Sequence, residues 1–169
     1  WGASNSVSLG DTPISVATRG NDPQVVAHQQ HLVAQWSTNG GSRFGAGPMA
    51  TAVSHDGGKN WVSGLNPAND GSTLGQNFSD MVADPDGTFY AAWIFSHPDE
   101  AGEGRGLDVA RSSDFGDTWD FQQVVDSRAC ECCWNKLVAS GAGQVRVLYR
   151  DHGTRDMALA STDDGGKSW

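Results

Sequence analysis

The chain has 169 residues, with 20 acidic against 11 basic side chains, 22 glycines and a hydrophobic fraction of 37%. A formal charge of −9 opposes binding to nucleic acid or to an anionic membrane, and no apolar stretch reaches the roughly 18 residues that cross a bilayer. No window keeps a helical apolar period, whereas short apolar runs bounded by Gly, Asp, Asn and Pro occur throughout. The composition therefore predicts an all-β chain that is rich in turns.

Three β-hairpins are predicted in chain order, at 23–36, 79–93 and 135–149. In each hairpin an apolar strand passes through a polar or Gly-rich turn into a second strand, which ends on an aromatic residue: Trp36, Trp93 and Tyr149. A third strand is predicted after each hairpin, at 49–54, 107–112 and 156–161.

Each third strand runs into the same eight-residue turn, which we call a box: 54–61 (SHDGGKNW), 112–119 (SSDFGDTW) and 162–169 (TDDGGKSW). In such a turn the Asp carboxylate accepts backbone N–H groups, the Ser or Thr adds a second local bond, Gly allows φ > 0, and Trp anchors the turn. The residues concerned are Ser54, Asp56, Gly58, Trp61, Ser112, Asp114, Gly116, Trp119, Thr162, Asp164, Gly166 and Trp169. Because the pattern recurs three times, it indicates architecture rather than catalysis.

A fourth segment follows the first two boxes, whereas the box ending at Trp169 has none after it. Four-strand units in series are typical of a β-propeller, and a β-sandwich is the alternative. A sandwich does not explain a turn that returns at one place in each unit. The chain is thus predicted to be a single propeller segment, 1–169, with blades at about 1–61, 62–119 and 120–169.

The pattern Ser/Thr-x-Asp-x-Gly-x-Ser/Thr/Asn-Trp resembles the Asp box, or BNR repeat, of the sialidase-like six-bladed propellers, over essentially the whole chain. The resemblance implies three four-stranded blades, which are half of a six-bladed ring. We expect the ring to be completed either by a second copy, as a homodimer of half-propellers, or by more residues of a longer chain. It also implies an extracellular or periplasmic protein whose partner is a glycan or small anionic ligand.

In sialidase-like proteins the ligand binds on the face opposite the boxes, so the resemblance places functional residues in the links on that face. The candidates for binding an anionic ligand are Arg43, Arg105, Arg150, Arg155, Asp80 and Trp134. Asp151 and Asp156 are candidates for acid/base work, and Tyr149 is the one tyrosine near this face, in place of the family's nucleophile.

A cysteine cluster, CECC at 130–133, places Cys130, Cys132 and Cys133 in one short loop. Three soft thiolates suit Cu(I) or zinc, and His152 or His97 could complete such a site. The alternatives are a disulfide between Cys130 and Cys133, a vicinal disulfide, or inert thiols.

Two further polar stretches call for a prediction. Asp99, Glu100 and Glu103 could hold a hard cation such as calcium, although such runs are more often flexible loops. The HQQH stretch at 28–31 is predicted to be a solvated turn on the box face.

Three functions stay open on the sequence alone. The first is a glycan-binding protein or exo-glycosidase of the sialidase-like type. The second is a non-catalytic propeller that binds copper or zinc through the CECC loop. The third is a structural half-propeller that assembles with itself.

Overall fold

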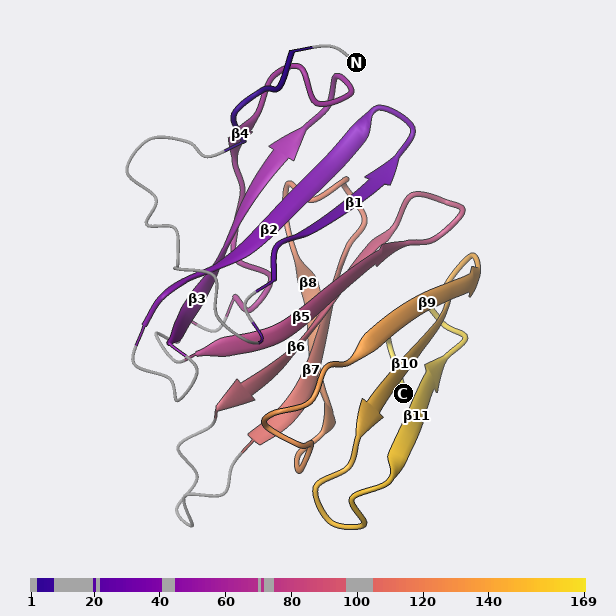
Figure 1. Cartoon of the computed structure of the whole chain (residues 1–169). Coiled ribbons are helices and arrows are strands. Elements are labelled where there is room, and N and C mark those ends of the chain that lie inside the picture. Colours follow the sequence, from indigo (N-terminus) through magenta and orange to yellow (C-terminus); the bar gives the residue numbers. More distant parts are fainter. Residues whose placement is uncertain are drawn as a thin grey trace.

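A computed structural model of the chain describes residues 3–7, 20, 22–40, 45–69, 71, 75–96 and 105–169. Within these ranges the chain forms eleven strands and no helix, and so nothing in them could cross a bilayer as a helix. The strands form three antiparallel sheets that lie side by side (Figure 1). The all-β propeller architecture predicted from the repeats is confirmed.

Each sheet is a meander in chain order. The first contains β1 (Gln24–His28), β2 (His31–Asn39), β3 (Ala46–Ser54) and β4 (Val62–Ser63). The second contains β5 (Gln76–Ala83), β6 (Phe89–Ser96), β7 (Arg105–Ser112) and β8 (Asp120–Asp126). The third contains β9 (Lys136–Gly141), β10 (Gln144–Arg150) and β11 (Met157–Thr162).

The strand after each of the first two boxes pairs with the strand before it, as β4 does with β3 and β8 with β7. The blades were predicted to end at the box tryptophans, Trp61 and Trp119. The first two sheets each include one further strand after that tryptophan. Among the described residues the third sheet has three strands rather than four, and the box that follows β11 runs to Trp169.

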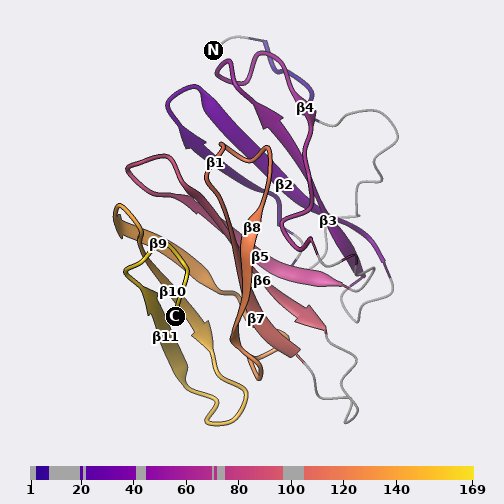
Figure 2. The same ribbon diagram turned by 180° about the vertical axis from the view of Figure 1, so that it is seen from behind.

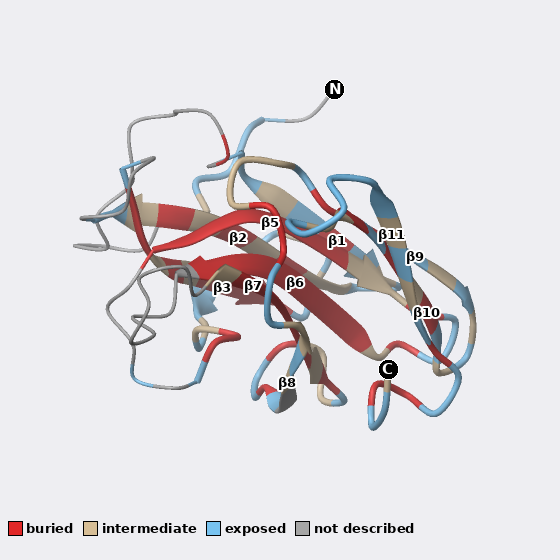
Figure 3. Ribbon diagram, turned by 90° about the horizontal axis from the view of Figure 1, so that it is seen from below, coloured by how far each residue is buried: buried red, intermediate tan, exposed pale blue. Residues whose placement is uncertain are grey.

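The middle sheet supplies both hydrophobic cores, because alternate residues of β6 point to opposite faces. Phe89, Ala91 and Trp93 pack with residues of the first sheet, such as Val33, whereas Tyr90, Ala92 and Ile94 pack with residues of the third, such as Val147. Both faces of β6 are consequently buried, and the view from below shows the buried strands at the centre of the molecule (Figure 3).

The outer face of the third sheet carries apolar side chains exposed to solvent. Its most exposed members are Val138, Leu148, Met157 and Leu159, with 42–63% of their surface accessible. On the first sheet, Val25 is likewise exposed. The middle sheet is covered on both faces, and each flanking sheet on one.

The first strands of the three sheets, β1, β5 and β9, lie next to one another (Figures 1 and 2). A break in the β5 register between Asn77 and Asp80, with Phe78 at a φ of 52°, turns the Asp80 carboxylate towards β9. The junction of β1, β5 and β9 therefore positions Asp80, one of the candidate site residues, beside β9.

Candidate functional sites

All three boxes share a set of internal hydrogen bonds. The hydroxyl of Ser54 donates to Asp56 Oδ1 at 2.9 Å and accepts from the Gly58 N–H at 3.0 Å. Ser112 and Thr162 repeat both bonds at 2.7–2.9 Å. The box glycines have φ of 83–95°, a region that L side chains rarely adopt.

The box carboxylates are held in their charged form. The N–H and side-chain amide of Asn60 hold the pKa of Asp56 at about 2, below the ordinary 3.8. At Asp114 burial raises the pKa, but the hydrogen bonds from Thr118 outweigh burial and the pKa is lowered. At Asp164 the hydrogen bonds from Ser168 lower the pKa. These aspartates cap turns, and a general acid would need the opposite shift.

The boxes also connect neighbouring sheets through a contact that the sequence did not suggest. His55 in the first box donates to or accepts from His31, with 2.8 Å between the Nδ1 atoms, and its Nε2 lies 3.0 Å from Asp117 Oδ1 in the second box. The His31 ring stacks on Phe115, with centroids 3.8 Å apart. His31 is therefore part of an inter-sheet contact, rather than only a solvated turn residue.

Asp80 links the second and third sheets. Its side chain is 4% exposed, and its carboxylate accepts from Lys136 Nζ at 2.7 Å and from the Leu137 N–H at 2.6 Å. Asn135, just before β9, donates to the Phe78 carbonyl at 2.6 Å. Asp80 was predicted to bind a ligand, and here its two oxygens are already engaged by β9.

A cavity of about 220 Å³ opens beside Asp80 and Trp134. It is lined by Gln24, Ser79, Asp80, Trp134, Asn135, Lys136, Leu148 and Met157. Trp134 is 50% exposed, its Nε1 donates to Asp22 Oδ2 at 3.2 Å, and its ring meets Phe78 edge-to-face. The indole is thus fixed on one side and open to solvent on another.

The candidate arginines that the structure describes, Arg105, Arg150 and Arg155, are not among the residues that line this cavity. Arg105 forms an ion pair with Glu131, and Arg150 donates to Cys133 Sγ at 3.7 Å and to the Arg155 carbonyl at 2.9 Å. Arg155 is exposed, with a φ of 65°, and Arg43 lies outside the described residues. The structure therefore brings Arg105 and Arg150 to the cysteine loop.

The catalytic candidates have ordinary structural environments. Burial, and a hydrogen bond with Asp126, raise the pKa of Tyr149 to about 12. Asp151 accepts from the N–H and hydroxyl of Thr154, which hold its pKa at about 2. Asp156 is exposed and its backbone closes the same turn. The raised pKa keeps the Tyr149 hydroxyl protonated, and the lowered pKa keeps the Asp151 carboxylate charged. The catalytic roles of these residues stay predictions.

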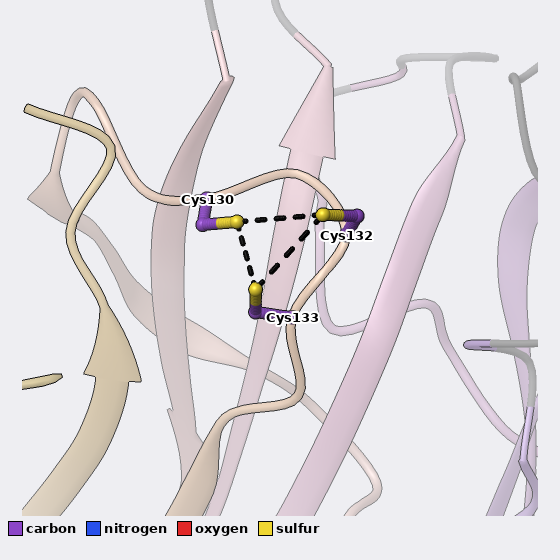
Figure 4. Close-up of side chains that lie close together, drawn as sticks. All are labelled: Cys130, Cys132 and Cys133. Atoms are coloured by element: carbon purple, nitrogen blue, oxygen red, sulfur yellow. Dashed lines mark hydrogen bonds between the residues drawn. The ribbon is translucent and has the colours of Figure 1, made fainter. Parts of the chain in front are cut away.

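The three cysteine sulfurs converge (Figure 4). Cys130 Sγ lies 2.8 Å from Cys133 Sγ and 3.5 Å from Cys132 Sγ, and the remaining pair is 4.0 Å apart. None of the three forms a disulfide, and Cys130 is buried. Among the described residues they are the one group of three potential metal ligands that lies this close together, so His152 is not brought to them.

Opposite pKa shifts accompany this proximity. Burial and the hydrogen bond with Cys130 raise the pKa of Cys133 to about 11. Burial also opposes ionisation of Cys130, but hydrogen bonds from Cys133 and from the Cys132 backbone outweigh it and lower the pKa of Cys130. One thiol of the cluster is therefore favoured as the first thiolate. The calcium candidates Asp99, Glu100 and Glu103, and also His97, lie outside the described residues.

Comparison with solved structures identifies proteins with a similar fold. A Hadza microbial sialidase matches 87% of the chain, with a TM-score of 0.61 and 20% identity. An α-L-arabinanase of Penicillium chrysogenum, solved with arabinobiose, matches 86% with a TM-score of 0.58 and 19% identity. The fold is that of a sialidase-like propeller.

A Trypanosoma rangeli sialidase, solved as a covalent intermediate, matches 92% of the chain, with a TM-score of 0.58 and 16% identity. The chain spans 32%, 46% and 28% of the lengths of these three proteins. No protein-family profile and no curated protein matches the sequence. At these identities the likeness concerns the fold alone.

Sequence reasoning predicted two of the lining residues, Asp80 and Trp134, and missed the other six: Gln24, Ser79, Asn135, Lys136, Leu148 and Met157. Ser79 is next to Asp80 and Asn135 is next to Trp134 in the sequence. Since Asp80 and Trp134 were predicted as site residues, their sequence neighbours could have been included. Lys136 faces the cavity because it pairs with Asp80, a contact that spans 56 positions and leaves no local pattern.

Proposed function

We propose that this protein is a glycan-binding propeller that holds one sugar ring in the cavity beside Trp134. The observation that carries the proposal is the half-exposed indole at the edge of a cavity lined by Gln24, Ser79, Asp80 and Lys136. Small-ligand sites combine apolar or aromatic surface with a few placed polar groups, and this cavity has both.

The cavity suits a small ligand. Its volume of about 220 Å³ is below the range of about 300–1,000 Å³ that is usual for drug-sized molecules. The Trp134 ring offers a flat apolar surface to the C–H groups of a sugar, and the Nε1 bond to Asp22 holds it in place. Gln24 and Ser79 can accept hydrogen bonds from sugar hydroxyl groups and donate to them, and the Lys136 ammonium group can donate. The structural neighbours act on sugars, which supports the same ligand class.

Hydrolysis is a separate prediction. Tyr149, Asp151 and Asp156 do not line the cavity. The proposal therefore concerns binding. Release of a fluorogenic aglycone from a sialoside, lost on Asp156→Asn, would add catalysis to it.

The test is a titration with arabinobiose and with sialic acid, followed by the indole N–H resonance of Trp134 in a two-dimensional NMR spectrum. We expect one of the sugars to shift this resonance and the shift to disappear in Trp134→Ala. Lys136→Met should lower the affinity for sialic acid more than the affinity for arabinobiose, because only sialic acid has a carboxylate that can pair with the ammonium group. Lys59→Met, in an exposed box position, is the matched control.

The proposal is overturned if neither sugar moves the Trp134 resonance at millimolar concentration. It is also overturned if Trp134→Ala, with an unchanged unfolding transition, binds as the wild type does.

A further inference from the structure

The cysteine loop has a feature that sugar binding does not use, namely three cysteines on one short segment that form no disulfide and have their sulfurs 2.8–4.0 Å apart. We propose that Cys130, Cys132 and Cys133 form a three-thiolate site for one Cu(I) ion. This inference is independent of the proposed sugar site.

The distances suit a central ion. Sulfurs that are each about 2.3 Å from a metal, the length of a zinc–thiolate bond, lie about 4 Å apart in a trigonal arrangement. The Cys132–Cys133 pair already has a separation of 4.0 Å, and the Cys130–Cys132 pair needs to open by only half an ångström or so from 3.5 Å. The Cys130–Cys133 pair, at 2.8 Å, needs the largest side-chain movement.

The loop that carries the thiols is fixed before any ion binds. The Cys130 N–H donates to the Arg150 carbonyl at 2.8 Å, and Ala129 forms a β-bridge with Asp151. At the other end Asn135 donates to the Phe78 carbonyl at 2.6 Å. Because the loop is anchored at both ends, its backbone loses little conformational freedom when an ion binds to the thiolates.

The ligand type favours Cu(I). Thiolates are soft ligands that select Cu(I), zinc or iron–sulfur clusters. Structural zinc takes four protein ligands, but the described residues bring only three together here, without His152 or a carboxylate. Three ligands that are all soft therefore fit Cu(I) better than zinc.

The charges around the loop fit the product of binding. One Cu(I) replaces three thiol protons, which pass to solvent, and a doubly negative copper–thiolate unit remains. Arg150 lies against Cys133, with its Nη1 3.7 Å from the sulfur, and can offset part of this charge. Glu131, the acidic residue inside the loop, is neutralised by Arg105.

The experiment adds the anaerobic, reduced chain to a coloured complex of Cu(I) with bicinchoninate and measures the copper transferred. Native mass spectrometry then counts the ions per chain. We expect one copper per chain and protection of all three thiols from iodoacetamide in the loaded protein. The alkylation result needs no variant and so does not depend on a mutant folding.

Cys132→Ser and Cys133→Ser are the informative variants, because both residues are only partly buried, unlike Cys130. Each should lower the Cu(I) affinity by more than about 100-fold, beyond the 10–100-fold expected for loss of an outer-shell partner. Arg150→Gln, as such an outer-shell change, should cost about 10-fold. Glu131→Gln and His152→Ala are the matched controls in the same region and should retain copper.

Several results would overturn the proposal. One is copper bound by Cys132→Ser with wild-type affinity, and another is copper lost in His152→Ala, which would make the imidazole a ligand. Equal competition by Zn(II) would overturn the copper assignment. A chain that stays lighter by two hydrogen atoms under mild reductant, and takes up no Cu(I), would show a disulfide in place of a metal site.

Discussion

Asp80 provides a sharp test of what joins the second and third sheets. Asp80→Ala removes the acceptor of the buried Leu137 N–H, which lies 2.6 Å from Oδ2, and leaves that donor without a partner. An unsatisfied buried donor costs about 1–3 kcal/mol, and a hydrogen bond to a charged group contributes about 1.5–3 kcal/mol. Because the two figures describe the same lost bond, they are not added. We expect the free energy of unfolding, measured in urea by tryptophan fluorescence, to fall by about 2–3 kcal/mol.

Asp80→Asn separates the two contacts of the carboxylate. The amide oxygen can still accept from Leu137, so only the ion pair with Lys136 is lost. Because the Lys136 side chain is 68% exposed, that ion pair should contribute no more than about 1 kcal/mol. Lys136→Met is the control for the ion pair alone. The reasoning fails if Asp80→Asn is as damaging as Asp80→Ala, or if Asp80→Ala costs less than about 0.5 kcal/mol.

Three further predictions concern the boxes and the outer face. Gly116→Ala should lower the free energy of unfolding by about 2–4 kcal/mol, because the new Cβ would clash with Val33 Cγ2 and the backbone has a φ of +95°. Gly57→Ala is the control: with a φ of +74° and open space around it, this change should cost only about 1 kcal/mol. Equal losses in the two variants would contradict the packing argument. The depressed pKa of Asp56 gives stability that is complete above its ordinary value and is lost as pH falls from about 4 to about 2, so Asp56→Asn should flatten the pH dependence of urea unfolding in that window. Leu159, 63% exposed on the outer face of the third sheet, should drive concentration-dependent association that Leu159→Lys weakens in sedimentation velocity, and a monomer at all concentrations would contradict this.

The sequence predicted those parts of the molecule that depend on local chemistry. The boxes follow from residues two to four positions apart, such as Ser54 with Asp56 and Gly58, and their hydrogen bonds are formed within one turn. The hairpins follow from apolar runs and turn residues. Both patterns are short-range, and a single sequence displays them directly.

The candidate site depended on long-range contacts and was predicted less well. Asp80 meets Lys136 across 56 positions, after a break in the β5 register that no sequence pattern marks. Tyr149 was singled out as the one tyrosine near the face opposite the boxes, and strand alternation turns its side chain into the core. The cysteines were recognised because they are adjacent, but the convergence of their sulfurs depends on how β5 and β10 anchor the loop.

The two-faced burial of β6 has a consequence for how the chain opens. The middle sheet shares one core with each neighbour, so it cannot separate from the rest without exposing both, whereas the third sheet can detach by breaking a single interface. In linear arrays of repeats, stability is a sum of unit and nearest-neighbour terms. Native-state hydrogen exchange should therefore be graded across the molecule: β6 amides would exchange only through global unfolding, and amides of β10 and β11 through a smaller, partial opening. The cysteine loop, which joins the middle sheet to the third, would lie at the hinge of that opening.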